Sequence, residues 1–274
     1  MDGRAETSGR FVLSLRLEAF FSEELSFCTD NYGMFTEYFT RQSQLLIDGL
    51  REQQEKRGIQ LPGKEKDLNI FRDLYNFFKD HLPPHFSLAT GKVRGKKHLF
   101  NKNIDLLIYH RWSPKFLEMT GGYVLADFLY SFFSIEADLS TTALVNHAAR
   151  TNALKSLFLG EKESEHGEEA PIPLFSTIFA YKSSVPLTSH RLAIQTTSRE
   201  KGISVNHELD MICILNDGLI IKDWENGGTY KIVETGQDTL LWFYILLLEY
   251  LDRDGAVGIN AREYIKNSKQ YKEY

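Results

Sequence analysis

The sequence has very little cysteine. Of its 274 residues only Cys28 and Cys213 are cysteines, and they lie far apart, without a CxxC pair or a Cys/His spacing. Two such residues suggest neither a structural zinc site nor a disulfide framework. A reducing compartment fits this composition best, and we expect a cytoplasmic protein.

Long apolar runs are also missing. The apolar segment 11–15 is interrupted by Arg16 and Glu18 before it reaches the length of a signal peptide. Segment 240–251 is strongly apolar, but about a dozen residues are too few to cross a bilayer and fit a buried helix better. We therefore expect no insertion into a membrane.

The chain has no excess of positive charge. Its 32 Lys and Arg residues stand against 37 Asp and Glu residues, which gives a formal net charge of -5. This balance argues against a protein that binds nucleic acid through bulk positive charge. Hydrophobic residues make up 42% of the sequence and aromatic residues 13%, which is enough for a full core. Intrinsic disorder and collagen-like structure are thereby excluded.

One basic segment stands out against this background, between residues 92 and 102. Its basic members are Lys92, Arg94, Lys96, Lys97, His98 and Lys102. Residues 94–98 are expected to form an exposed connection between two strands. On an acidic protein this segment is the natural surface to contact the phosphates of DNA, through Lys92, Arg94, Lys96 and Lys97. A solvated turn without a ligand is the alternative, and the sequence does not decide between the two.

Apolar periodicity predicts helices and strands in the first half of the chain. Helical spacing predicts helices over 35–56 and 68–78, which end at Gly58 and at Leu82-Pro83-Pro84. A change of period then predicts three strands, over 86–93, 103–109 and 130–137. The first two strands form a hairpin in this prediction.

The second half alternates further between helices and strands. Capping residues at 139–142 predict a helix that runs to about Phe158, followed by a solvated acidic loop at 161–169. A helix near Thr188 and the apolar helix 240–251 follow. The strands are predicted over 174–181, 210–215, 219–224 and 230–233. The order of these elements predicts an α/β fold, an α+β mixed sheet flanked by helices.

Two acidic residues lie within apolar strands, where a buried apolar side chain is normal. Asp105 interrupts the strand 103–109, and Glu136 lies in the apolar end of 130–137. Acids on neighbouring strands can meet at one rim of a sheet. Two carboxylates there suit a hard cation such as Mg²⁺, which can activate water against a phosphodiester. Acids that cap helices or pair with a basic residue are the alternative.

Four segments together carry a resemblance to a known fold. They are Gly91-Lys92-Val93, Asn103 to Tyr109, Arg111-Trp112-Ser113-Pro114 and Phe133 to Asp138. Their order and spacing resemble the PD-(D/E)XK nuclease superfamily and its restriction-endonuclease-like core. More narrowly, they resemble the NucC-like effector nucleases of bacterial anti-phage signalling and a related bacterial domain family of unknown function. The resemblance implies a nuclease-like domain over 61–274, preceded by an N-terminal helical extension over 1–60.

This resemblance implies a metal-dependent DNA endonuclease that acts in anti-phage defence by abortive infection. In the family pattern, Asp105 and Glu136 bind Mg²⁺ or Mn²⁺. The family's lysine falls at position 138, where this sequence has Asp138, so the expected site is an atypical D...ExD arrangement. An aspartate can act as a base toward water but cannot offset the charge of a phosphate.

A second position departs from the family pattern. Family members usually place a glutamate on the helix before the Leu-Pro break, whereas this sequence reads Asn69-Ile70-Phe71-Arg72 there. Arg150 or Lys155 on the following helix could replace the missing positive charge, although ordinary surface cations are the simpler interpretation. An inactive nuclease-fold protein that binds a nucleotide, nucleic acid or protein remains an alternative. His110 and His147 are interpreted as structural.

The resemblance also implies an activating ligand and an assembly. In NucC-like nucleases a cyclic trinucleotide binds at a threefold centre and drives trimers into hexamers, so a homo-oligomer is expected. The ligand-binding positions correspond here to His85, Trp112 and Ala256, and only the aromatic character of Trp112 matches. Its indole can stack on a base. A helical interaction module based on the helix 35–56 is a third interpretation.

Overall fold

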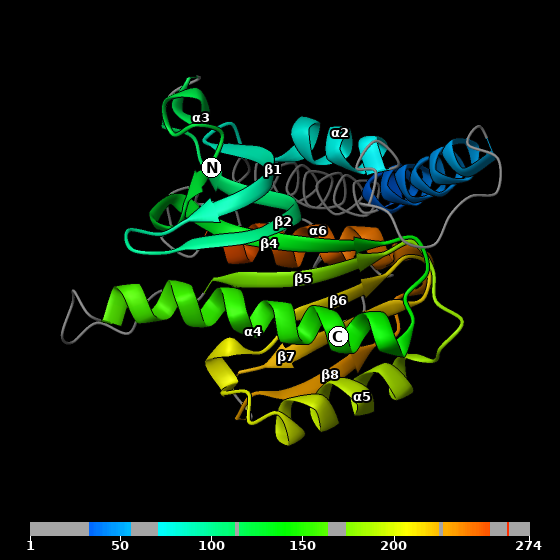
Figure 1. The fold of residues 1–274 in the computed structure, drawn as a ribbon. Helices are drawn as coiled ribbons and strands as arrows, with labels where there is room; N and C mark the ends of the chain where they lie inside the picture. The colour runs from blue at the N-terminus through cyan, green and yellow to red at the C-terminus, as the bar shows by residue number, and fades with distance from the viewer. Residues whose placement is uncertain are drawn as a thin grey trace, which may run out of the picture.

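The computed structural model describes residues 33–55, 71–112, 115–163, 174–224, 227–252 and 262. The expected boundary between an N-terminal extension and a nuclease-like domain, near residue 60, lies outside these residues and stays a prediction. The described elements form a mixed sheet with helices on both faces (Figure 1).

Within the described residues, eight strands form one sheet in the order β3-β1-β2-β4-β5-β6-β7-β8. Their bounds are β1 Phe86–Arg94, β2 Leu99–His110, β3 Val124–Leu125, β4 Leu129–Glu136, β5 Phe175–Ala180, β6 Met211–Ile214, β7 Gly218–Asp223 and β8 Thr229–Val233. The central strands β4, β5 and β6 run parallel, antiparallel pairs continue the sheet on both sides, and the edge strand β3 runs parallel to β1. The mixed sheet predicted from the element order is thus confirmed.

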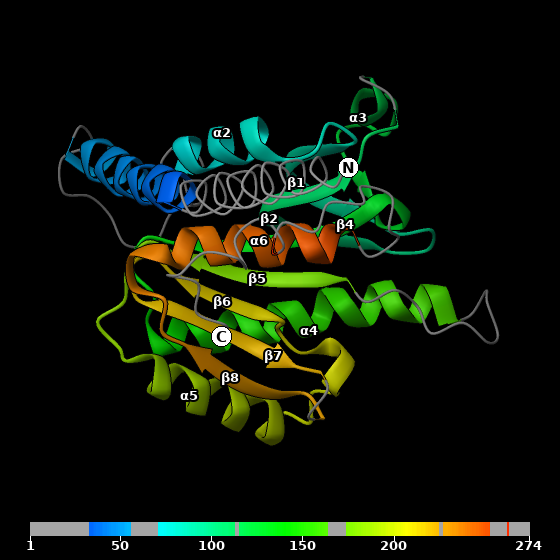
Figure 2. The same ribbon diagram turned by 180° about the vertical axis from the view of Figure 1, so that it is seen from behind.

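Helices cover both faces of this sheet. In the described part of the chain they are α2 Arg72–His81, α3 Phe116–Met119, α4 Thr141–Glu163, α5 Leu187–Glu200, α6 Thr239–Leu251 and a helix over 33–55, with 3-10 turns η2 Ala126–Phe128, η3 Val205–His207 and η4 Gly236–Asp238. α4 and α5 lie against one face, and α6 lies against the other (Figures 1 and 2). None of the helices described is both long enough and apolar enough to span a membrane.

The α6 face of the sheet holds a hydrophobic cluster that joins the helix over 33–55 to the sheet. Phe39 of that helix and Phe77 of α2 belong to this cluster, together with Phe133 of β4 and Phe243 of α6. α6 is apolar on nearly all sides, apart from Thr239 and Glu249, and a helix of this kind is typically buried. The structure therefore confirms that 240–251 is a buried helix.

The β1–β2 hairpin bends over the opposite face, on which α4 lies. β1 has register shifts on both sides of Gly91, whose φ of 125° is rare for a residue with a side chain. Beyond this bend, Val93 and Phe100 pack in a cluster with Phe132 of β4 and Leu154 of α4. The tip of the hairpin therefore lies on the α4 side of the sheet.

Some element boundaries differ from those predicted. α4 continues to Glu163, so the start of the expected acidic loop is helical, and residues 164–169 of that loop lie outside the described residues. β2 begins at Leu99 instead of residue 103. The sequence pattern does not predict α3, β3 or η2, because such short elements show no apolar period.

Candidate active site

Asp105 and Glu136 lie on neighbouring antiparallel strands. Leu106 of β2 pairs with Phe133 of β4, which places Asp105 beside the C-terminal half of β4. The Asp105 side chain is buried, and its Oδ2 accepts a 2.8 Å hydrogen bond from the backbone N–H of Ile135, the residue before Glu136. The structure thus brings these two residues together at one end of the sheet.

His147 of α4 contacts the Glu136 carboxylate. The His147 Nε2 and Glu136 Oε1 atoms lie 2.6 Å apart, and both side chains are mostly buried. α4 follows β4 and packs back on the same face, so a residue in its second turn reaches the end of the strand. Sequence reasoning interpreted His147 as structural and missed this contact. The available signal was a histidine close to the apolar inner face of a helix that directly follows an acidic strand end.

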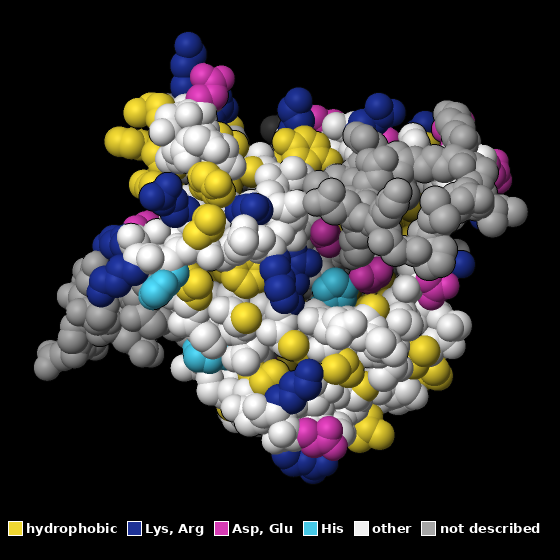
Figure 3. All heavy atoms as spheres, in the orientation of Figure 1, with side chains coloured by type: hydrophobic (Ala, Val, Ile, Leu, Met, Phe, Trp, Pro, Cys, Tyr) yellow, Lys and Arg dark blue, Asp and Glu magenta, His cyan; other side chains and the backbone are white. Residues whose placement is uncertain are grey.

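Arg150 lies one turn further along α4, near Asp105. Burial lowers the pKa of the Arg150 guanidinium, and the negative charge of Asp105 partly offsets this shift. The Nη2 atom of Arg150 is buried and has no hydrogen-bond partner. Over β4 and α4, basic, acidic and histidine side chains adjoin one another on the surface (Figure 3). α4 therefore brings an imidazole and a guanidinium to the two acids.

Asp105 also borders a hollow of about 240 Å³ between α2 and the sheet. The hollow is lined by Phe71, Arg72, Tyr75, Thr90, Asp105, Leu106 and Ile135. Arg72 of α2 is exposed and brings a positive charge to this hollow, from the segment in which the family pattern has a glutamate. Asn69 and Ile70 of that segment lie outside the described residues. The hollow gives a ligand access to the neighbourhood of Asp105.

Asp138 lies beyond the end of β4 and pairs with a residue outside the site. Its Oδ2 is 3.4 Å from Lys182 Nζ, and the two side chains are 49% and 71% exposed. An exposed pair of this kind contributes little to stability and is easily exchanged for another partner. The catalytic role of Asp138 stays a prediction.

The donor set of this site suits Mg²⁺. Among the residues that the structure describes, no group of three or more His, Cys, Asp or Glu side chains is arranged to hold a metal ion. Mg²⁺ is commonly bound through one or two carboxylates, with water and substrate phosphates completing its coordination. Asp105 and Glu136 supply two carboxylates, and Asp105 borders the hollow through which such a substrate can approach.

The tip of the β1–β2 hairpin carries a second hollow, of about 220 Å³. Its lining is strongly basic and consists of Arg94, Gly95, Lys96, Lys97, His98, Leu99 and Tyr123. The connection 94–98 is exposed apart from Gly95, as predicted, whereas Lys92 is half-buried on β1. Because the hairpin bends, this basic tip lies on the same face of the molecule as α4, at the left of Figure 3.

The segments that carry His85 and Trp112 meet at the base of the hairpin. The backbone N–H of Arg111 donates a 2.7 Å hydrogen bond to the His85 carbonyl, which joins the two segments. Trp112 is 67% exposed, and its ring stacks on Phe128 at 6.1 Å with an interplanar angle of 11°. Ala256, the third expected ligand contact, lies outside the described residues.

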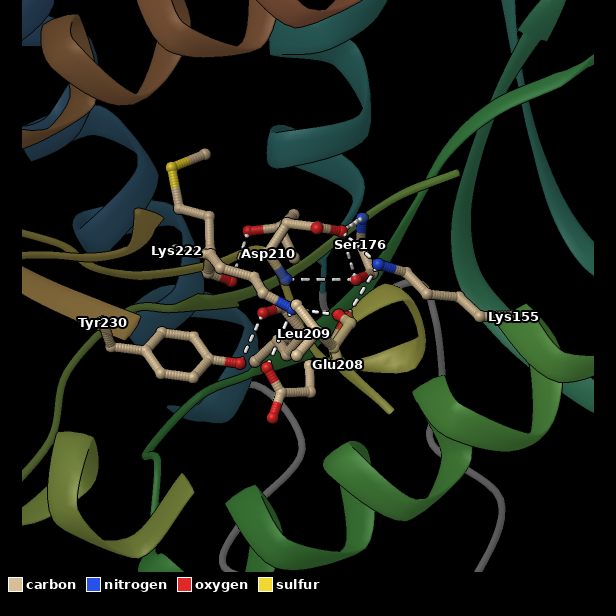
Figure 4. Close-up of polar contacts among 10 residues, drawn as sticks. Lys155, Ser176, Glu208, Leu209, Asp210, Lys222 and Tyr230 are labelled. Carbon is tan, nitrogen blue, oxygen red and sulfur yellow. Dashed lines mark hydrogen bonds and ion pairs between the residues drawn. The ribbon is translucent and has the colours of Figure 1, made fainter. Parts of the chain in front are cut away.

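Lys155, the second cation considered on α4, belongs to a separate buried network (Figure 4). Its Nζ lies 2.5 Å from Asp210 Oδ2 and 2.7 Å from the Glu208 carbonyl. The same Asp210 oxygen accepts hydrogen bonds from the N–H and the hydroxyl of Ser176. Ser176 and Asp210 lie at the start of β5 and β6, whereas Glu136 ends the parallel strand β4. Lys155 is therefore at the opposite end of the sheet from the candidate site.

Comparisons with known proteins identify the fold. No protein-family model matches the sequence, and no curated protein matches it. The structure resembles cAAA-bound NucC from P. aeruginosa ATCC27853 at 12% identity, with a TM-score of 0.56 over 80% of this chain and 90% of that chain. It resembles cAAA-bound NucC from E. coli MS115-1 at 14% identity, with a TM-score of 0.54 over 81% and 89% of the two chains. The chain therefore has the fold of the NucC nucleases, which confirms the fold class predicted from the sequence.

Proposed function

We propose that this chain is a Mg²⁺- or Mn²⁺-dependent DNA endonuclease of the PD-(D/E)XK fold that acts in the cytoplasm as a bacterial anti-phage effector. The observation that carries the proposal is the meeting of Asp105 and Glu136 at one end of the sheet, linked by the hydrogen bond from Ile135 to Asp105. The fold shared with the two NucC structures supports it.

Each polar residue of the site has a proposed role. Asp105 and Glu136 are the metal ligands, and a bound divalent ion would act there as a Lewis acid that lowers the pKa of water. His147 fixes the orientation of the Glu136 carboxylate. Asp138 accepts the proton of the attacking water, for which it must exchange Lys182 for that water. The exposure of the Asp138–Lys182 pair is compatible with this exchange.

The basic hairpin supports DNA as the substrate. Lys92, Arg94, Lys96 and Lys97 are the proposed DNA-contacting residues, and three of them line the hollow at the hairpin tip. This tip concentrates positive charge on a chain whose net charge is -5. The tip lies on the α4 side of the sheet, and α4 also carries His147 and Arg150 of the candidate site, so we expect one DNA backbone to follow both.

Cleavage of plasmid DNA tests the proposal. With Mg²⁺ or Mn²⁺ the parent protein is expected to nick or linearise plasmid, and Asp105→Asn and Glu136→Gln are expected to lower the rate roughly 100-fold or more, because each removes a ligand charge. Asp127→Asn and Glu200→Gln are matched controls, since both residues are exposed and lie outside the site. Equal cleavage by the parent and Asp105→Asn would remove the proposal.

A cyclic trinucleotide is the proposed activator, and His85, Trp112 and Ala256 are its proposed contacts. Both NucC structures compared above contain cAAA, which supports this ligand class. A homo-oligomer, a trimer or hexamer, is proposed together with it. The cleavage assay is therefore run with and without cAAA, and light scattering of the same samples reports the assembly.

A second candidate function is a catalytically inactive subunit on the same fold that binds a nucleotide, nucleic acid or protein. Two contacts favour it, because Glu136 is paired with His147 and Asp138 is paired with Lys182. The Glu136 and Asp138 carboxylates are then each paired with a basic side chain of the protein itself. Metal-dependent cleavage by the parent protein, lost in Asp105→Asn, would contradict this alternative.

A further inference from the structure

The candidate site lacks the lysine that the nuclease pattern places on the strand, and its positive charge comes from helices. Asp138 occupies that strand position and pairs with Lys182. Lys155 is bonded to Asp210 in the separate buried network. Arg150 is the α4 cation whose charge interacts with Asp105.

We propose that Arg150 is the phosphate-binding residue of this site, with its Nη2 donating a hydrogen bond to a non-bridging oxygen of a phosphodiester that lies against Asp105 and Glu136. The inference rests on the proposed function, because it assigns the substrate-binding cation of the same site.

The first support is an unsatisfied hydrogen-bond donor. Arg150 Nη2 is buried and has no hydrogen-bond partner. Buried polar groups of folded proteins are almost always hydrogen-bonded, and an exception indicates a missing partner such as a bound ion. A phosphate oxygen is a strong acceptor for a guanidinium, because the bond is assisted by both charges.

The second support is the position of Arg150 on α4. Arg150 follows His147 by three residues, so the two side chains leave the helix on one face. His147 contacts Glu136, and the charge of Arg150 acts on Asp105. The same helix therefore positions the guanidinium and the imidazole that contacts one of the two acids.

The third support is the charge of the site. A phosphodiester carries a negative charge and approaches two carboxylates, so a nearby cation is needed to offset the repulsion. Arg150 supplies that cation from α4, and Arg72 supplies a second, exposed one across the hollow that Asp105 borders. The planar guanidinium also matches phosphate geometry, which the compact charge of a lysine does not.

Binding without cleavage tests the inference. The full chain is titrated in EDTA with a fluorescein-labelled duplex DNA, followed by anisotropy, and with inorganic phosphate, followed by phosphorus NMR. Arg150→Gln is expected to weaken binding roughly tenfold, and Arg150→Lys is expected to weaken it less. The matched control Arg199→Gln removes an exposed arginine of α5 and is expected to bind as the parent does. Thermal melting shows that each variant is folded.

The outcomes separate the ligand sources. Weaker binding of both probes supports a site for any phosphate group, and weaker binding of DNA alone supports a site that needs the polynucleotide backbone. Unchanged affinity of Arg150→Gln for both probes would overturn the inference. If Arg150→Gln does not fold, the affinity of Arg150→Lys is measured instead. A lysine does not reproduce the guanidinium fork, so we expect weaker binding, and unchanged affinity would count against the inference.

The same samples distinguish this inference from the proposed function. A parent protein that binds DNA through Arg150 but never cleaves plasmid would contradict the endonuclease proposal and leave the phosphate site intact. If the parent cleaves plasmid and Arg150→Gln binds and cleaves as the parent does, the endonuclease proposal stands and the phosphate-binding role of Arg150 is contradicted.

Discussion

Two groups of charged side chains involve residues of α4, and they differ in whether a hollow adjoins them and in whether each buried cation has a carboxylate partner. Lys155 and Asp210, at the start of β5 and β6, are 1% and 2% exposed and are bonded to each other. At the other end of the sheet, Asp105 borders a hollow, and Arg150 has a buried Nη2 without a hydrogen bond. The first, closed group borders no hollow that the described residues form, whereas Asp105 of the second, open group borders one that a ligand can enter.

The closed group has the features of a structural network. Lys222 pairs with Glu208 at 2.8 Å, and the Tyr230 hydroxyl donates a 2.7 Å hydrogen bond to the Leu209 carbonyl. Burial lowers the pKa of the Lys155 ammonium, and the adjacent Asp210 carboxylate opposes that shift. Each buried lysine thus has a carboxylate partner. The network holds α4 against the sheet, and nothing in the structure explains why Asp210 Oδ1 has no hydrogen bond.

Buried charge alone does not mark a functional site in this protein. Each group combines a cation of α4 with carboxylates carried by other elements. The side chains of Lys155 and Asp210 are more deeply buried than those of Arg150 and Asp105. The open group is distinguished by the adjoining hollow and by the donor that is left over. Substitutions in the two groups should therefore separate stability from activity.

The largest effect is expected in the closed network. Lys155→Met leaves the Asp210 carboxylate buried without its cation, and we expect the free energy of unfolding to fall by about 3–5 kcal/mol. Urea denaturation measures this loss. Lys201→Met, at an exposed position after α5, is the control and should change stability by less than about 0.5 kcal/mol.

A second substitution shows whether the loss comes from the uncompensated carboxylate. Asp210→Asn removes the negative charge and keeps an acceptor for the Ser176 N–H. Added to Lys155→Met, it should recover part of the lost stability, because the buried charge is then gone. A Lys155→Met variant as stable as the parent would mean that the closed network is not what holds α4.

A smaller, purely functional effect is expected at His147. His147→Gln loses the imidazole that orients Glu136, so we expect the plasmid cleavage rate to fall roughly 10- to 100-fold. We also expect the Mg²⁺ concentration for half-maximal rate to rise, which a merely structural role would not produce. His110→Gln is the matched control, and a parallel change in both variants would argue against a specific role of His147.

Sequence patterns predict the elements that carry the site better than the contacts within it. Asp105 and Glu136 stand out because a charged residue interrupts an apolar strand, and a two-residue period makes such an interruption visible. Arg150 and Lys155 are both cations of one predicted helix, and no pattern separates them. Their different roles depend on which side chains of other elements they meet, Asp105 in one case and Asp210 in the other.

The contact between His147 and Glu136 is hidden for a similar reason. It joins residues of successive elements, and it depends on how α4 packs back on β4 after the connection. The bend of the β1–β2 hairpin is equally tertiary, since it requires the left-handed backbone at Gly91 and the packing of Phe100 against the α4 side. Patterns within a single strand or helix therefore predict neither the contact between His147 and Glu136 nor the bend of the hairpin.

Calorimetric titration with Mn²⁺ tests most directly the claim that Asp105 belongs to a functional site and Asp210 to a structural one. The folded parent protein and the Asp210→Asn variant are predicted to bind Mn²⁺ with equal affinity, while Asp105→Asn, with its fold confirmed by melting, should give no binding heat. Retention of the parent's Mn²⁺ affinity by Asp105→Asn would contradict the account.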